Sequence, residues 1–322
     1  MHSFPILSSL FEKQFDKRHF PISPENLYNA SQYILGIGGK RVRPVCVLMA
    51  NELFNDIHPD AYHVANAVEL FHNFSLIHDD IMDKAPLRRG ASTVHKKYGE
   101  NTALLAGDVM LVAAYGHINR IRPEYLQRII ALFNDTAMHV CEGQQLDMDF
   151  EEREEVNFND YLEMITLKTS ALLASSLQMG AIIGGAGSGN QQHIYEFGKN
   201  LGIAFQVQDD YLDAFGDPEK FGKQVGGDIL ANKKTFLMIH ALEVTGEKGM
   251  KELRQLTMNK NNEDKIKSTL QFFRECKVDS WAKELKEKYY QQALLHLEET
   301  AVLSARKKEL IELAGSLLLR EN

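Results

Sequence analysis

The chain has 322 residues, 44% of them hydrophobic and 25% charged, with a formal net charge of −8 at pH 7. These proportions are typical of a globular protein with a sizeable core, and an acidic chain without a long basic tract argues against nucleic acid as a partner. No run of about 18 uncharged apolar residues occurs, so no membrane span is expected. The first 20 residues carry charges and do not resemble a signal peptide. Because Cys46, Cys141 and Cys276 lack metal-type spacing, we expect buried thiols and a cytoplasmic protein.

Helix-forming sequence dominates the chain. We predict helices over residues 24–35, 45–54, 61–83, 93–98, 101–120, 123–145, 158–184, 191–215 and 234–245, and about three more amphipathic helices between residues 248 and 320. An acidic bend is predicted at 147–159, a charged loop at 84–93, and a long glycine-rich loop of the lid type at 216–232. Few segments alternate as strands do. The chain is therefore predicted to be one all-α domain over residues 1–322.

Two acidic clusters follow apolar runs. Asp79 and Asp83 are four residues apart and share a helix face, and Asp209 and Asp213 repeat this spacing. Like charges on one face repel, so a cation is expected to offset them. Mg²⁺ binds through one or two carboxylates together with substrate phosphates, which suits such pairs, and neither cluster has the alternating ligands of an EF-hand loop. A solvated helix face is the alternative, and the apolar residues before each cluster argue against it.

Basic residues form a second pattern. The stretch from Gly38 to Pro44 reads Gly-Gly-Lys-Arg-Val-Arg-Pro, a flexible turn with three cations that can cradle an anion, although it is not a P-loop. Arg88 and Arg89 suit bidentate phosphate contacts, with a solvated loop as the alternative. Isolated cations follow at Lys168, Lys223 and Lys233. A phosphate ester with a hydrophobic tail would suit this charge pattern and the aromatic residues Phe71, Phe74, Phe205 and Tyr211. His78-Asp79 lacks the further ligands of an HD phosphohydrolase, and no nucleophile elbow is visible.

Seven ordered motifs make the chain resemble the trans-polyprenyl diphosphate synthases, specifically the short-chain farnesyl and geranylgeranyl group. They are residues 38–44, 76–83, 87–90, 143–147, 168–169, 205–213, and 227–229 with 233–235. The resemblance extends from about Ile34 to Thr235. It implies an all-α, isoprenoid-synthase-type bundle around a deep central active-site cavity, usually dimeric, with Mg²⁺ as cofactor.

The resemblance also implies roles for the matching residues. Mg²⁺ would be held by Asp79, Asp83 and Asp209, with Asp80, Asp210 and Asp213 in support. The allylic diphosphate would be held by Arg88, Lys168 and Lys223, with Lys233 nearby. Isopentenyl diphosphate would be held by Lys40, Arg43, His72 and Arg89. Gln206 and the carbonyl groups of Lys168 and Thr169 would face a developing cation.

The implied reaction joins isopentenyl diphosphate to dimethylallyl, geranyl or farnesyl diphosphate. The allylic diphosphate ionises, the isopentenyl double bond attacks, and a proton is lost. No side-chain general base is evident, and the resemblance implies that the released diphosphate takes the proton.

Product length is predicted from the residues before Asp79. Ser75, Phe74 and Phe71 lie four, five and eight positions earlier, one and two helical turns below the metal, where a bulky residue would close the tunnel. Among relatives, long-chain synthases usually have a small residue in place of Phe74, and farnesyl synthases of the eukaryotic type have aromatic residues at both of the first two positions. We predict mainly a C20 product, geranylgeranyl diphosphate, with the C15 farnesyl product as the alternative.

Two other classes are weighed against this prediction. A terpene cyclase shares the first Asp motif, but its second metal motif is normally an Asn/Asp-Ser/Thr-Glu pattern, which Asp209 to Asp213 does not follow. A non-catalytic subunit of a heteromeric synthase typically loses Asp residues from one motif, whereas both motifs are intact here. A catalytic chain is therefore expected, and the resemblance implies that it forms a homodimer.

Overall fold

The structure is a computed structural model that describes residues 1–153, 155–216, 225–257 and 261–319. Within these ranges nearly all regular structure is helical, which confirms the all-α prediction. The exception is a two-stranded antiparallel hairpin, β1 (Leu87–Arg88) and β2 (Ala91–Ser92), where a loop was predicted. Its turn residues Arg89 and Gly90 have φ values of 52° and 77°, so the left-handed turn lets two strands pair without an Asn-Gly sequence.

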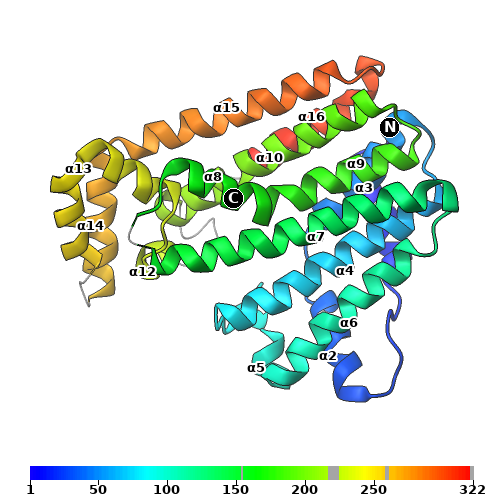
Figure 1. Cartoon of the computed structure of the whole chain (residues 1–322), viewed down its shortest axis with the longest axis horizontal. Helices are drawn as coiled ribbons and strands as arrows, with labels where there is room; N and C mark the ends of the chain where they lie inside the picture. Colours follow the sequence, from blue (N-terminus) through cyan, green and yellow to red (C-terminus); the bar gives the residue numbers. More distant parts are fainter. Residues whose placement is uncertain (154, 217–224, 258–260, 320–322) are drawn as a thin grey trace. The chain divides into compact units, whose positions relative to one another are not determined.

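Residues 217–224 of the glycine-rich loop predicted at 216–232 lie outside the described residues. Helices occupy the predicted regions, with shifted ends, and also two regions where none was predicted, Phe4–Phe15 and, within that loop, Gly227–Leu230 (Figure 1). They are α1 (Phe4–Phe15), α2 (Glu25–Gly36), α3 (Val42–Phe54), α4 (Pro59–Met82), α5 (Val94–Tyr98), α6 (Glu100–Ile118), α7 (Pro123–Glu152), α8 (Phe158–Ile165), the π-helical turn η1 (Thr166–Ser170), α9 (Ala171–Ile183), α10 (Ser188–Phe215), α12 (Gly227–Leu230), α13 (Phe236–Thr257), α14 (Asn262–Glu275), α15 (Val278–Glu299) and α16 (Ser304–Leu318).

The acidic bend predicted from Asp147 is wrong in its first part, because α7 continues helically to Glu152. The Lys234 ammonium donates hydrogen bonds to the carbonyl groups of Phe150 and Arg153, and so satisfies the end of the helix. A lysine more than 80 residues away thus allows the acidic segment to remain helical, which local sequence does not reveal.

The chain divides into two compact units, and each is described by itself. Unit 1 comprises Met1–Asp135, Ser175–Tyr195 and Thr300–Glu309. Unit 2 comprises Thr136–Ala174, Glu196–Glu299 and Leu310–Asn322.

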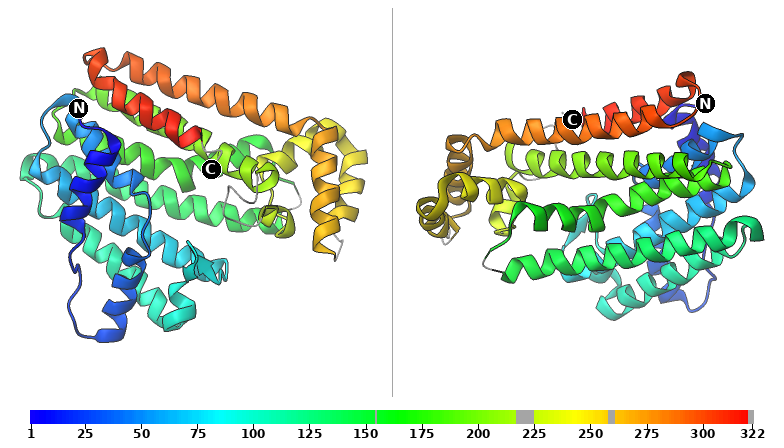
Figure 2. Two further views of the ribbon diagram at one scale, coloured as in Figure 1. Left: turned by 180° about the vertical axis from the view of Figure 1, so that it is seen from behind. Right: turned by 45° about the horizontal axis from the view of Figure 1, so that its top comes forward.

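Unit 1 is built around α4, whose middle is buried on most sides, as its apolar sequence predicts. Helix α6 lies alongside α4 (Figure 1), and Gly107 makes this possible, because a Cβ there would overlap the His78 ring. Helix α1 packs against α3 and α4 (Figure 2). Gly107 therefore leaves room for the His78 ring between α6 and α4.

In unit 2, the η1 turn packs closely against α7 and α10, and each of these helices has a glycine at the contact. A Cβ on Gly143 of α7 would lie 2.7 Å from the Cα of Lys168, and one on Gly202 of α10 would lie 2.8 Å from the Cα of Ser170. Both glycines lie one helical turn before a polar residue, Asp147 and Gln206 respectively. The close packing therefore directs these two side chains toward η1.

Two expectations about the whole chain can be compared with the structure. Among the described helices, none is long and apolar enough to cross a membrane. Cys46 and Cys276 are buried as expected, but Cys141 is exposed on α7, so the prediction of three buried thiols is wrong at that position.

Candidate functional site

The first acidic cluster lies at the C-terminal end of α4. Asp79 is half-buried in the last turn, and Asp83 is the exposed C-cap residue. Asp80 is buried, and both of its carboxylate oxygens accept hydrogen bonds of 2.7–2.9 Å from the Arg88 guanidinium. The Asp80 carboxylate therefore holds the Arg88 guanidinium in place, whereas Asp79 and Asp83 are the more accessible carboxylates.

The Gly38–Gly39 turn meets the hairpin that carries Arg89. Gly38 and Gly39 have φ values of 88° and 145°, and the Arg89 guanidinium donates a hydrogen bond to the Gly38 carbonyl. A Cβ on Gly39 would lie 2.6 Å from a nitrogen at the end of the flexible Arg89 side chain, so it is the φ of 145° rather than this contact that favours glycine. The two basic stretches predicted separately therefore come together in unit 1, with Lys40 exposed beside them.

Four arginines dominate the charge of this region. Arg41 pairs with Glu69, and Arg43 donates to His72 Nε2 at 3.3 Å. Burial, followed by repulsion from Arg43 and Arg89, lowers the pKa of His72 well below its ordinary value, so the ring is neutral at pH 7. Burial is also the largest cause that lowers the pKa of Arg43. Arg41 and Arg88 are thus paired with Glu69 and Asp80, whereas Arg43 and Arg89 lie near a neutral His72, an arrangement that favours binding of an anion there.

The predicted chain-length residues lie in an aromatic cluster of unit 1. Phe71 and Phe74 are 1% and 9% exposed. The Phe71 ring lies 5.5 Å from that of Phe74 and 5.4 Å from that of Phe133, and Phe74 also contacts the His78 ring at 4.7 Å. Ser75 is half-buried, and its hydroxyl donates to the His72 carbonyl. The Phe74 ring therefore packs against Phe71, which packs in turn against Phe133.

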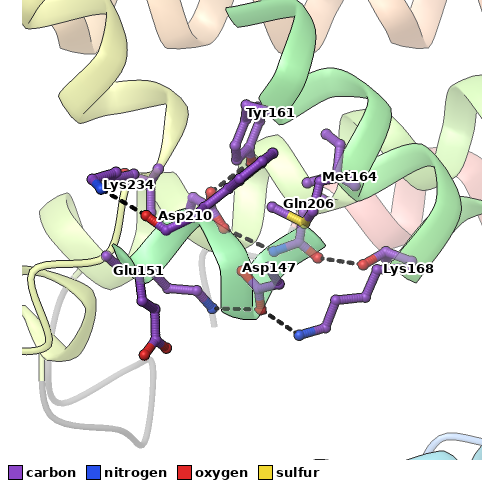
Figure 3. A pocket seen from close by; sticks show the side chains of 13 residues that line it. Asp147, Glu151, Tyr161, Met164, Lys168, Gln206, Asp210 and Lys234 are labelled. Atoms are coloured by element: carbon purple, nitrogen blue, oxygen red, sulfur yellow. Dashed lines mark hydrogen bonds and ion pairs between the residues drawn. The ribbon is translucent and has the colours of Figure 1, made fainter. Parts of the chain in front are cut away.

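A cavity of about 50 Å³ in unit 2 contains most of the remaining predicted residues (Figure 3). Its lining residues come from α7, α8, η1, α10 and the segment before α13: Asp147, Phe150, Glu151, Tyr161, Met164, Ile165, Lys168, Thr169, Gln206, Asp210, Lys233, Lys234 and Thr235. The π-helical turn that carries Lys168 and Thr169 is a feature often found at functional sites.

Asp147 organises the cations of this cavity, although we assigned it no role from the sequence. Its carboxylate pairs with Lys168 and lies 3.7 Å from Lys233 (Figure 3). Burial raises the pKa of Asp147, but Lys233 and Lys168 outweigh burial and hold the pKa below its usual range. The motif at residues 143–147 could have indicated this role of Asp147, because a glycine one helical turn before a carboxylate permits close packing beside it.

Asp210 is the centre of a second hydrogen-bond network in the cavity. Its Oδ2 accepts from the Tyr161 hydroxyl at 2.6 Å, and its Oδ1 accepts from Gln206 Nε2 at 2.8 Å. Gln206 Oε1 accepts from the Thr169 hydroxyl at 3.0 Å. Burial, followed by repulsion from Asp228, raises the pKa of Asp210 to about 7. Tyr161 and Asp228 are further residues that we did not select from the sequence.

The other two acids of this cluster are more accessible. Asp209 and Asp213 are half-buried, whereas Asp210 is 7% exposed. Asp213 Oδ2 accepts the Asp228 backbone N–H at 3.0 Å, which ties the end of α10 to the start of α12. The cluster thus divides as the first one does, with its second acid buried.

Each acidic cluster presents a pair of carboxylates rather than a complete metal site. In the described part of the chain, no three acidic, histidine or cysteine side chains converge as a closed metal cage. Pairs of carboxylates suit Mg²⁺, which keeps waters and takes phosphate oxygens as ligands.

The predicted site residues therefore form two groups. Unit 1 brings together Lys40, Arg43, His72, Arg88 and Arg89 beside Asp79, Asp80 and Asp83. Unit 2 brings together Lys168, Thr169, Gln206, Asp210 and Lys233, with Asp209 and Asp213 on the same helix as Gln206. Lys223 lies outside the described residues.

Comparison with known proteins identifies the class. A crystal structure of a geranylgeranyl pyrophosphate synthase matches with a TM-score of 0.94 and 42% identity, covering 100% of both chains. The fold is therefore that of the helical prenyl diphosphate synthases, as the resemblance implied.

The family follows from the sequence. The polyprenyl synthetase family matches residues 24–273, and the chain belongs to this family. A short chain isoprenyl diphosphate synthase of Methanothermobacter thermautotrophicus is 38% identical over 94% of this chain and 92% of its own length. A geranylgeranyl pyrophosphate synthase of Geoglobus acetivorans is 36% identical over 93% and 92%, and a geranylfarnesyl diphosphate synthase of Aeropyrum pernix is 36% identical over 91% and 93%.

Proposed function

We propose that the chain is a prenyltransferase that condenses isopentenyl diphosphate with an allylic diphosphate to give geranylgeranyl diphosphate. The observation that carries this proposal is the cluster of four arginines around a neutral His72, next to the Asp79–Asp83 pair. The arginines favour an anion and the carboxylate pair favours a cation, and a metal–diphosphate ligand supplies both together. The names of the relatives agree with this chemistry.

Each group of cations has a proposed substrate. Isopentenyl diphosphate is bound by Lys40, Arg43, His72 and Arg89. Because Arg43 donates to Nε2 of the neutral His72 ring, the Nδ1 of that ring can carry the proton and donate it to a ligand. Arg88 and Lys168 bind the allylic diphosphate, with Lys233 nearby and Lys223 in the same role. Asp80 and Asp147 act as anchors that hold Arg88 and Lys168 in place before substrate arrives.

The acidic clusters are proposed to bind Mg²⁺. Asp79, Asp83 and Asp209 are the ligands, and Asp213 supports Asp209. When bound, the ion stabilises negative charge on a departing diphosphate. Asp80 and Asp210 are the less suitable ligands, because the oxygens of both already accept strong hydrogen bonds.

Gln206 and η1 are proposed to face the allylic carbon chain as positive charge develops. The Gln206 amide oxygen and the carbonyl groups of Lys168 and Thr169 present partial negative charge toward that position. The neighbouring side chains Met164 and Ile165 are apolar and nearly buried, so they limit the water that could quench a cation.

Phe74 is proposed to limit the product to 20 carbons. Its ring is packed against Phe71, which is packed in turn against Phe133, so the barrier does not depend on one side chain alone. The geranylfarnesyl relative makes a C25 product the neighbouring outcome, and C15 remains the shorter alternative.

We further propose that both units form one polyprenyl synthetase domain over residues 1–322 and that the enzyme is a homodimer. The family match includes residues from both units. Exposed apolar residues Leu105 and Val112 lie seven positions apart on α6, 55% and 70% exposed, and offer a face for a second copy. The cytoplasm, which the cysteine pattern led us to expect, remains our proposal for the location.

The function is tested by incubating the isolated chain with labelled isopentenyl diphosphate and each allylic primer, and then separating the products by length. We expect C20 product, loss of activity with EDTA, and recovery with Mg²⁺. A cyclic hydrocarbon would indicate a terpene cyclase, and no product without a second polypeptide would indicate a non-catalytic subunit. Products of C30 or longer would refute the role of Phe74.

A further inference from the structure

Tyr161 has no role in the proposed reaction, yet it lies at the end of a buried polar chain that leads to Gln206. The chain runs from the Tyr161 hydroxyl to Asp210, from Asp210 to the Gln206 amide, and from that amide to the Thr169 hydroxyl (Figure 3). Tyr161 is 1% exposed and Asp210 is 7% exposed. A hydroxyl in this environment carries a desolvation cost unless it makes a hydrogen bond, and Asp210 is its partner.

The position of Tyr161 is fixed by its own helix. Asn157 and Asp160 form a capping box at the start of α8, in which each side chain accepts a hydrogen bond from the other's backbone N–H. The Tyr161 ring then packs against Phe236 of α13, with ring centroids 5.7 Å apart. A phenylalanine would satisfy this packing equally well, so the hydroxyl serves Asp210 rather than the core.

The hydrogen bonds to Asp210 determine which way the Gln206 amide points. Tyr161 holds one carboxylate oxygen, and this fixes the plane of the carboxylate. The other oxygen accepts from the NH₂ end of Gln206, an orientation that keeps the amide oxygen away from the carboxylate oxygens. The Gln206 oxygen is thereby left facing Thr169 and the cavity.

We propose that Tyr161 is a positioning residue that, through Asp210, sets the orientation of the Gln206 amide so that its oxygen faces the reacting carbon chain. This inference rests on the proposed prenyltransferase function for its kinetic consequence. Its structural consequence, the fixed amide, does not depend on that function.

The test is Tyr161→Phe, with Tyr290→Phe as the matched control, because Tyr290 lies on α15 outside the cavity. In protein labelled with ¹⁵N at glutamine side chains, the Gln206 NH₂ signals are assigned from their absence in Gln206→Ala. We expect Tyr161→Phe to shift or broaden these signals and Tyr290→Phe to leave them unchanged. Unchanged signals in Tyr161→Phe would overturn the proposal, whatever the enzyme makes.

Kinetics supply the second measurement. We expect Tyr161→Phe to lower kcat about tenfold with little change in KM for the allylic diphosphate, because the lost interaction acts in the transition state. In a Gln206→Ala background, the same substitution should change kcat by less than about twofold, since its target is gone. Independent, multiplying effects would overturn the proposal. A wild-type chain that makes no prenyl diphosphate would instead refute the proposed function, while the amide signals would still decide the role of Tyr161.

Discussion

Gly143→Ala is expected to disable the cavity of unit 2 without adding or removing a polar group. The new Cβ would lie 2.7 Å from the Cα of Lys168 and closer still to its backbone nitrogen, whereas ordinary contact begins at 3.4 Å. The two backbones must therefore separate by at least 0.7 Å, the difference between these distances. Overpacking of this kind costs about 1–3 kcal/mol of stability. A misplacement of about 1 Å at a catalytic group can cost about 100-fold in rate.

The assay compares kcat and thermal stability for Gly143→Ala and a control, Gly116→Ala. A Cβ on Gly116, in the last turn of α6, would meet nothing within 4 Å. The control should keep its activity and gain roughly 0.5–1 kcal/mol in stability, because alanine loses less backbone entropy on folding. A Gly143→Ala enzyme that stays folded with kcat within about threefold of wild type would refute the argument that this close packing positions Lys168 and Asp147.

Three further predictions concern unit 1. Phe74→Ala should move the main product from C20 to C25 or longer in the product-length assay, and an unchanged length would mean that another residue closes the tunnel. Asp80→Asn should lower the free energy of unfolding by about 3 kcal/mol in urea denaturation, because Arg88 loses a buried partner. Adding Arg88→Met should recover part of this loss. If the two substitutions lower stability additively, the pairing argument is wrong. Burial, followed by repulsion from Arg120, lowers the pKa of His117 to about 4. The unfolded chain therefore binds more protons between pH 6.5 and 4, so stability is full above pH 6.5 and falls as the pH drops toward 4, by at most about 3 kcal/mol. His117→Gln should flatten this decline in thermal denaturation, and an equally steep decline would show that other groups cause it.

The all-α fold could be predicted from the sequence because its signals are local. Apolar residues recur at helical spacing over most of the chain, and glycine turns separate the segments. The pairing of Asp79 with Asp83 is equally local, since it depends only on the helical repeat. Features of this kind need no knowledge of what lies across the fold.

The residues that sequence reasoning missed depend on distant partners. Asp147 becomes a site residue only because Gly143 lets α7 approach η1 and because Lys233 lies nearby. Tyr161 gains its role from Asp210, 49 residues away in sequence. The same dependence made the predicted bend after Asp147 wrong, since the helix is completed by Lys234.

The two acidic clusters show how one short motif can carry two functions. On a helix, the first and last aspartates share a face, while the second is turned away by about 100°. At both clusters this second residue, Asp80 or Asp210, is buried and accepts hydrogen bonds from a side chain with a proposed role toward substrate, Arg88 or Gln206. We therefore propose that the consecutive aspartates have two roles. The more exposed acids would bind a cation, and the buried acid would hold in place the side chain that faces the substrate. In both clusters the buried carboxylate accepts hydrogen bonds from two donor groups, and the helical repeat places it on a different face from the other two acids.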